Sequence, residues 1–397
     1  MQQVLSGIKV IELGQLIAGP FAAKTLADFG AEVIKIEPPG SGDPLRTWRM
    51  LKDGTSVWWD VQSRNKESVA VDLRSAEGQE VVRRLAAGAD VVIENFRPGT
   101  LEAWGLGWER LQALNPRLIM LRLSGFGQSG PRSREPGFAA VAEAFGGLRY
   151  LTGERGRPPV RNGVSIGDTV AGLHGAFGVM LALYLRDARG GAGQMIDLAL
   201  YESIFNLTES LLPEYDAFGA VRQPAGGALP GITPSNAYRC RDGRDVLVAG
   251  NGDSIFRRLM TAIGRTDLAQ DPTLSGNLGR VARAAEIDAA IGAWTQSLDI
   301  DAVLAALAAA DVPASRTYTI AELADDPHYA ARGNIEHIAS STGGTVAAPG
   351  IVPRLSQTPG RVRQAAPRLG EHTEATLQRL GYDAAAIADL RARKVVS

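Results

Sequence analysis

The chain has 397 residues, of which 45% are hydrophobic and 21% are charged, and its formal net charge at pH 7 is −1. This length suits one large domain or two, and the composition is that of an ordinary globular protein. A nearly neutral chain has no global basic field to attract nucleic acid or anionic lipid, and a single cysteine excludes an internal disulfide and a Cys-rich metal site. We therefore expect a cytoplasmic protein with no metal, nucleic-acid or membrane partner.

The first third of the chain alternates strand and helix patterns. Short apolar runs predict strands at 8–13, 31–39, 67–73, 90–96 and 117–127. Helical patterns lie between them at 18–30, 75–89 (with Ser75 as a candidate N-cap) and 100–116. Such alternation predicts βαβ units in a doubly wound parallel sheet, whose ligands bind beyond the carboxyl ends of the strands. No G-x-G-x-x-G follows the first strand, which disfavours a dinucleotide-dependent oxidoreductase.

The rest of the chain predicts a second, smaller domain. Residues 128–167 are rich in Gly, Pro and Arg around one predicted helix at 137–148, and helical sequence at 169–187 is followed by a strand turning into a helix at 193–212. After a Gly- and Pro-rich segment come a hairpin at 236–250 and helices at 254–264, 281–298 and 300–311. We expect a large α/β domain over 1–219, a small α+β domain over 220–330, and a C-terminal segment over 331–397 that includes a helix at 374–382.

One carboxylate stands out in the segment VRNGVSIGDTVAGLHG at 160–175, where Asp168 separates an apolar run from a run of small residues. An Asp at the junction between a turn and a helix is a good N-cap, and on the residues alone this interpretation is favoured. The two roles are compatible, because a helix N-terminus keeps a carboxylate ionised and an ionised carboxylate can be a nucleophile.

Polar residues at the predicted strand ends are candidates for anion binding. In ENFRPG, Asn95 and Arg97 can bind phosphate and ribose while Phe96 can stack on a base; the alternative is an ordinary loop with Arg97 in solvent. Basic residues at other strand ends are individually typical of solvated charges, but together they could form an anion site at one sheet edge. These residues are Lys35, Arg46, Lys66 and Arg74.

Several of these segments occur together, and in this order, in one known family. The set comprises GIKVIELGQLIAGPF, SRNKESVAVDL, DVVIENFRPGTLEAWGLG, NPRLIMLRLSGFGQSGP, SIGDTVAG and PRLGEHTEATLQRLGY. It resembles the class III coenzyme A transferases, which include formyl-CoA:oxalate, carnitine and succinyl-CoA:dicarboxylate transferases. The resemblance spans nearly the whole chain. It implies that the chain returns from the small domain to the large one, and that two chains interlock as a homodimer.

The resemblance also implies a chemistry, namely CoA transfer between short-chain acids, with dicarboxylic acids among the candidates. The carboxylate of Asp168 would attack the acyl-CoA thioester, form a mixed anhydride and then carry CoA as an aspartyl thioester. CoA is then a substrate, and no tightly bound cofactor is expected. The residues themselves suggest Arg97 as a contact of CoA, and the resemblance implies further contacts at Leu16, Ile17, Val71, Arg74, Asn95, Phe96 and Phe138.

The chain departs from the family pattern at Phe138-Ala139, where many members have Tyr-Asp. The missing hydroxyl and acid argue against an oxalate-type specificity. Pro38 and Ile17 stand where one formyl-transferase member has Arg and Gln.

An α-methylacyl-CoA racemase on the same fold is the first alternative, but its catalytic His falls at the position of Phe138 and a phenyl ring cannot transfer a proton. A non-catalytic CoA-binding protein is the second, and it would not need Asp168. Three arginines that could bind a second carboxylate favour dicarboxylic substrates, namely Arg46, Arg149 and Arg161.

Overall fold

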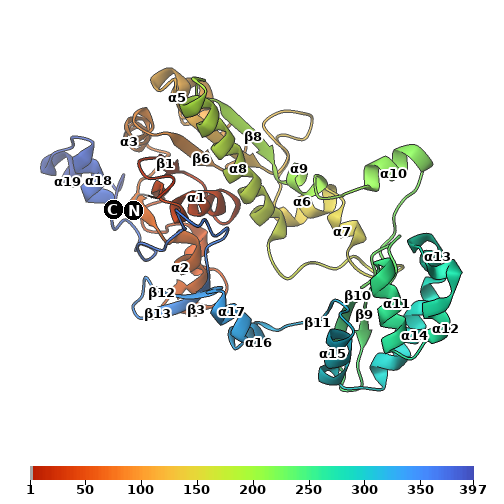
Figure 1. Cartoon of the computed structure of the whole chain (residues 1–397). Helices are drawn as coiled ribbons and strands as arrows, with labels where there is room; N and C mark the ends of the chain where they lie inside the picture. The colour runs from red at the N-terminus through yellow and green to blue at the C-terminus, as the bar shows by residue number, and fades with distance from the viewer. Residues whose placement is uncertain (1–2) are drawn as a thin grey trace. The chain divides into compact units, whose positions relative to one another are not determined.

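The computed structural model describes residues 3–397, which form two compact units (Figure 1). Unit 1 contains the described residues up to Arg149 together with Asn162–Glu209 and His328–Ser397, whereas unit 2 contains Tyr150–Arg161 and Ser210–Pro327. Each unit is organised around its own buried apolar residues. The domain limits predicted at 219/220 and 330/331 stay a prediction.

Unit 1 is built on a six-stranded sheet with the order β5-β2-β1-β6-β7-β8, and every neighbouring pair is parallel. The predicted parallel sheet is therefore confirmed, and each of the five strands predicted in the first third of the chain is present. The chain starts in the middle at β1, builds outward to β5 and then restarts at β6 on the other side. The strands are β1 (Lys9–Glu12), β2 (Glu32–Glu37), β5 (Lys66–Ala70), β6 (Val91–Glu94), β7 (Ile119–Ser124) and β8 (Met195–Ala199).

Helices cover both faces of this sheet because successive strand residues point to opposite sides. Val10 of β1 is buried with α1 (Ala18–Asp28) and α8 (Ile166–Ala188), while Ile11 is buried on the other side. That second side is covered by α3 (Ala76–Ala87), α5 (Trp108–Leu114), α18 (Thr373–Arg379) and α19 (Ala384–Ala392). The predicted N-cap is confirmed, since Ser75 accepts a hydrogen bond from the Gly78 N–H at 3.0 Å.

Shorter elements connect the strands of unit 1. They are η1 (Pro44–Thr47), β3 (Leu51–Lys52), β4 (Thr55–Ser56), α2 (Val57–Ser63), α4 (Thr100–Ala103), α6 (Ala139–Phe145) and α9 (Leu200–Phe205), and α7 (Leu148–Leu151) spans the junction with unit 2. The C-terminal segment contributes the hairpin of β12 (Ile335–Ala339) and β13 (Thr345–Pro349), and Val396 forms a bridge with Val71 next to β5. Figure 1 shows α18 and α19 beside the strands formed by the first part of the chain.

Unit 2 has a three-stranded antiparallel sheet packed with helices. The sheet contains β9 (Ser235–Arg239), β10 (Asp245–Ala249) and β11 (Ala314–Arg316), so the predicted hairpin is present. The single helix predicted over 281–298 is divided by Arg283 into α13 and α14. The remaining elements are α10 (Leu211–Phe218), α11 (Asp253–Ala262), α12 (Thr266–Gln270), η2 (Pro272–Leu274), α13 (Asn277–Ala282), α14 (Ala284–Gln296), α15 (Ile300–Ala309), α16 (Ile320–Ala324) and α17 (Pro327–Ala331), the last of which spans the junction with unit 1.

Candidate functional site

The strand order of unit 1 defines the place where a ligand is expected. The connections that leave β1 and β6 run in opposite directions along the sheet, and ligands of doubly wound proteins bind in the crevice at this switch point. Asn95 ties the two loops together: its side-chain oxygen accepts from the Gln15 N–H at 2.8 Å, and its side-chain nitrogen donates to the Gln15 carbonyl at 2.8 Å. A side chain at Gly14 would come within 3.1 Å of Asn95, so the loops approach too closely there for a larger residue.

A cavity of about 340 Å³ opens at the carboxyl ends of these strands. Its lining includes Gln15 from the loop after β1, Pro38 from the loop after β2, Val71 and Arg74 from the loop after β5, and Phe96 from the loop after β6. Three of the residues predicted to contact CoA therefore share one cavity. The Arg74 side chain is 80% exposed and lies 2.9 Å from Asp72, whose pKa it lowers through their hydrogen bond.

The remaining predicted contacts lie outside the lining of this cavity. Leu16 and Ile17 belong to the loop between β1 and α1. Leu16 has a φ of 64°, a conformation uncommon for a branched residue, and its N–H donates to both carboxylate oxygens of Asp43 at 3.1 Å. Arg97 is exposed after β6, and Phe138 precedes α6 with 68% of its surface exposed. Which of these side chains contact CoA stays a prediction.

The basic residues at the strand ends do not form the anion site considered from sequence. Lys35 is fully buried, with its ammonium 2.7 Å from Glu12 and 2.7 Å from Asp43, and Lys66 is buried 2.7 Å from the other oxygen of Glu12. Burial opposes the charge of Lys35, but Asp43 and Glu12 outweigh it and raise its pKa. Burial lowers the pKa of Lys66 to about 8. Lys35 stabilises the loop after β1, because it also donates to the Gly14 carbonyl at 2.8 Å, whereas Lys66 donates to the Pro20 carbonyl of α1 at 2.9 Å.

Two arginines considered for a second substrate carboxylate already hold carboxylates of the protein. Arg46 lies 2.8 Å from Glu37 with its guanidinium over the Trp59 ring, and Arg149 lies 2.6 Å from the buried Glu143. Arg161, the third, belongs to unit 2. Arg46 and Arg149 therefore do not support the prediction of dicarboxylic substrates.

A group that sequence reasoning only partly identified lies behind the loop after β6. Glu94 is 1% exposed; one oxygen lies 2.7 Å from Nε of Arg122, and the other accepts from the Phe96 N–H at 2.7 Å. The two terminal nitrogens of Arg122 donate hydrogen bonds to the two carboxylate oxygens of Glu102. Burial raises the pKa of Glu94 to about 7, opposed by Arg122. The signal in the sequence was an Arg in the middle of the apolar run RLIMLRLSG.

Asp168 lies in the first turn of α8, and the structure corrects its predicted position. The helix begins at Ile166, so Ser165 is the N-cap residue and Asp168 is the third residue of the helix. The capping interpretation is therefore wrong in position, although the electrostatic argument survives. The positive end of a helix dipole acts within the first turn, and it favours the ionised form of a carboxylate placed there. Asp168 is half-buried.

Small residues bring three elements together around this turn. A side chain at Gly167 would meet Ala139, the first residue of α6, at 3.2 Å, and one at Gly172 would meet the Ala18 carbonyl oxygen at the start of α1 at 2.7 Å. Gly172 is four residues after Asp168 and hence on the same face of α8. The carboxylate turn of α8 therefore packs beside the starts of α6 and α1, and α1 follows the loop that borders the crevice. Sequence reasoning noted the small residues but could not say what they contact.

Comparisons with known proteins agree with this geometry. A family model described as CoA-transferase family III matches residues 5–373. The chain belongs to this family, and it is a CoA-transferase.

The relatives carry narrower names. Succinyl-CoA–D-citramalate CoA-transferase of Chloroflexus aurantiacus is 46% identical over 99% of this chain and 98% of that one. Succinyl-CoA–L-malate CoA-transferase alpha subunit from the same species is 42% identical over 100% of this chain and 93% of its own length. The crystal structure of a CAIB/BAIF family protein from Brucella suis matches with a TM-score of 0.84 at 36% identity, over 96% of this chain and all of that one. The resemblance identified from sequence is confirmed.

Proposed function

We propose that this protein transfers CoA from succinyl-CoA to a second dicarboxylic acid, with Asp168 as the nucleophile. The observation that carries the proposal is the placement of Asp168 in the first turn of α8, beside the starts of α6 and α1 and thus next to the switch-point crevice. The names of the relatives support dicarboxylic substrates, because the citramalate and malate enzymes are 46% and 42% identical to this chain over nearly its whole length.

The steps balance without an oxidant, a metal or ATP. A carboxylate oxygen of Asp168 attacks the thioester carbonyl, the C–S bond breaks and the CoA thiolate leaves a mixed anhydride. The thiolate then attacks the aspartyl carbonyl and releases succinate, which leaves CoA on Asp168 as a thioester. The acceptor carboxylate attacks this thioester, and the thiolate finally attacks the acceptor's acyl carbon and frees Asp168. Each step exchanges activated acyl groups of similar energy.

The N-terminus of α8 supports these steps electrostatically. Its partial positive charge favours the carboxylate before attack and the oxyanion that forms on the tetrahedral carbon. Gly167 and Gly172 let the starts of α6 and α1 approach this turn closely, which supports its place beside the crevice.

The direct test is to mix the protein with succinyl-CoA and a panel of dicarboxylic acids and to follow new thioesters by mass spectrometry. The proposal predicts release of succinate and formation of the acceptor's CoA ester. Hydroxylamine should trap the intermediate as a hydroxamate on Asp168. Trapping at another residue would contradict the nucleophile, and exchange of an α-proton in D2O without any acceptor would support the racemase alternative instead.

We also propose a homodimer in which a second copy covers the outer face of α8; the resemblance implies an interlocked pair. α8 has 23 residues and is long and apolar enough to cross a membrane by length and composition. One side packs on α1 and the sheet, whereas Leu173, Phe177, Leu181 and Tyr184 are 55–61% exposed along the other. These positions repeat at intervals of three or four residues and form one stripe. The cytoplasmic location stays a prediction.

Light scattering tests the dimer directly. Phe177→Glu should convert it to a monomer, because the stripe would carry a charge at its centre. Leu114→Glu is the matched control, since Leu114 is also exposed but belongs to α5 on the opposite side of the sheet. A monomeric wild-type protein, or an equal effect of both variants, would contradict the proposal.

A further inference from the structure

The loop after β6 is held by three charged residues, which we call the Glu94 triad: the buried Glu94 and Arg122, and Glu102, whose side chain is 41% exposed. Glu94 ends β6, Arg122 lies opposite it in the register of β7, and Glu102 comes from α4. Nε of Arg122 is 2.7 Å from Glu94, and its terminal nitrogens are 2.7 and 3.2 Å from the two oxygens of Glu102. The guanidinium therefore links the end of the sheet to the helix that follows the loop.

The triad acts on the backbone through Glu94. Its second oxygen accepts from the Phe96 N–H at 2.7 Å, which fixes the turn between them. Inside that turn Asn95 bonds twice to Gln15, and after it the Phe96 ring packs edge-on against Trp104 with centroids 5.3 Å apart. Gln15, Phe96 and Trp104 all line the 340 Å³ cavity. One buried carboxylate is thus hydrogen-bonded to a turn whose residues and their partners line the cavity.

Stability alone is a poor reason for this arrangement. Buried ion pairs are often no better for stability than apolar residues of the same volume, because both charges must be removed from water. Both oxygens of Glu94 are engaged, and one of them holds the loop that borders the crevice rather than another part of the core.

We infer that Glu94 is a positioning residue that sets the affinity of the crevice for CoA by fixing the Asn95-Phe96 turn, with Arg122 holding Glu94 in place. This inference rests on the proposed function in one respect, namely that the cavity takes CoA. It differs from that proposal in what it predicts, because a change in the turn weakens binding while the chemistry at Asp168 continues once CoA is bound.

The test measures the dissociation constant of free CoA by calorimetry and, separately, kcat and KM for succinyl-CoA. Glu94→Ala should raise the dissociation constant and KM about tenfold, which corresponds to about 1.4 kcal/mol, while kcat stays within about twofold. Glu94→Gln keeps an acceptor for the Phe96 N–H but cannot neutralise Arg122, so its effect should be smaller, about threefold.

Asp28→Asn is the matched control. Asp28 is a buried carboxylate that pairs with the buried Arg64 at 2.8 Å, at the end of α1 far from the carboxyl ends of the strands. It should lower the melting temperature without changing the CoA dissociation constant. The double variant Glu94→Gln/Arg122→Gln removes both charges, and it should recover melting temperature relative to Glu94→Ala while CoA binding stays weak.

The outcomes separate the two proposals. If the Glu94 variants bind CoA as tightly as the wild type, or if Asp28→Asn weakens CoA equally, the positioning role is wrong and CoA transfer is unaffected. If the wild type binds CoA, the Glu94 variants bind it more weakly and no acid accepts it, the positioning role stands and the proposed function falls. A wild-type protein that does not bind CoA would overturn the positioning role as well.

Discussion

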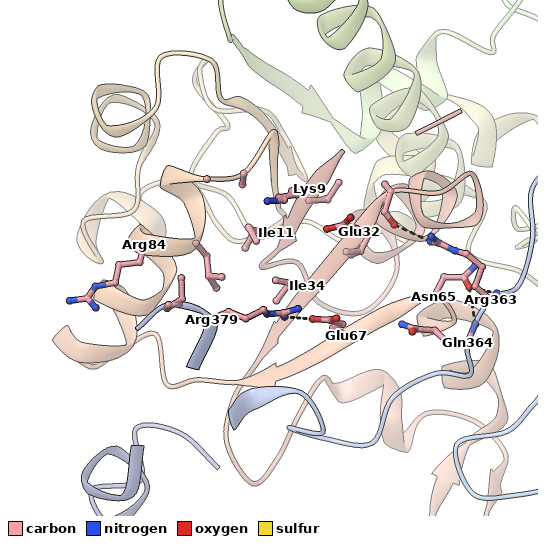
Figure 2. Close-up of a pocket in the computed structure, with 17 residues that line it drawn as sticks. Lys9, Ile11, Glu32, Ile34, Asn65, Glu67, Arg84, Arg363, Gln364 and Arg379 are labelled. Atoms are coloured by element: carbon pink, nitrogen blue, oxygen red, sulfur yellow. Dashed lines mark hydrogen bonds and ion pairs between the residues drawn. The ribbon is translucent and has the colours of Figure 1, made fainter. Parts of the chain in front are cut away.

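The two edges of the unit 1 sheet both carry a cavity and paired charges, but the charges at the carboxyl edge are buried and those at the amino edge are more exposed. The amino edge has the larger cavity, about 590 Å³, lined by residues that begin β1, β2 and β5 (Figure 2). There Arg363 donates to the backbone carbonyls of Ala27, Gly30 and Ala31, and Arg379 lies 2.6 Å from Glu67. These contacts tie the C-terminal segment to α1 and to the sheet.

At the carboxyl edge the cavity is smaller, about 340 Å³, but its walls are loops held by buried charges from behind. Lys35 and Asp43 hold the loop after β1, and Glu94 holds the loop after β6. None of the residues predicted to bind CoA or to react lines the amino-edge cavity. Strand direction sends the free loops to the carboxyl edge, so this edge is where a ligand is expected although its cavity is the smaller of the two.

The largest expected effect is at the nucleophile. Asp168→Asn preserves shape but removes the attacking carboxylate, so kcat for CoA transfer should fall at least about 10³-fold. The control is Asp187→Asn at the other end of α8, where Asp187 pairs with Arg186 and Arg117 at the surface. Steady-state assays of both variants check this, and substantial turnover by Asp168→Asn would remove Asp168 from the mechanism.

The next effect concerns the packing that places Asp168. Gly172→Ala puts a methyl group 2.7 Å from the Ala18 carbonyl oxygen, so α8 and α1 must separate; we expect a loss of about 1–3 kcal/mol in unfolding free energy, with reduced kcat. Gly178→Ala is the matched change on the same helix, because its methyl group meets only the Ile196 side chain at 3.4 Å. Urea unfolding should show Gly178→Ala near or above wild-type stability.

A pair of exposed arginines compares the two cavities directly. Arg74 lines the carboxyl-edge cavity and Arg84 lines the amino-edge one, and both are paired with a nearby carboxylate. Arg74→Ala should raise KM for succinyl-CoA about 3- to 10-fold through loss of a charge-assisted contact with a phosphate. Arg84→Ala should leave KM unchanged. The reverse result would move the CoA site to the amino edge.

The smallest effect is a pH dependence. The pKa of the Glu94 carboxyl is raised from 4.5 to about 7 by burial, with Arg122, Glu102 and the Phe96 N–H facing it. The charge that pairs with Arg122 is present above pH 7, so the CoA dissociation constant should rise as the pH falls through 7, by no more than the Glu94→Gln effect. The contribution of this group to unfolding free energy has the opposite sense: it falls as the pH rises from 4.5 to 7 and is constant above. Calorimetry from pH 6 to 8 measures the CoA dissociation constant. In Glu94→Gln this constant should lack the part of its pH dependence that comes from Glu94.

Much of the secondary structure of both units was predictable because its signals are local. Apolar runs of strand length, a helical pattern with Ser75 before it, and Asp242-Gly243 between two strands each depend on a few neighbouring residues. The start of α8 was misplaced by a few residues for the same reason: Asp168 is a good capping residue by type, but the helix begins three residues earlier, with Ser165 at the N-cap position.

The sequence by itself determined the order of strands and helices, the presence of a carboxylate beside small residues, and the family to which this ordered set belongs. Only the tertiary structure decided which charges are buried and which line the cavity. Lys35, Lys66 and Arg46 follow the same pattern as Arg74 along the chain, and all four pair with protein carboxylates, yet only Arg74 lines the cavity with an exposed side chain. The physical reason is that burial and pairing depend on neighbours brought from distant strands, which spacing along one chain does not specify.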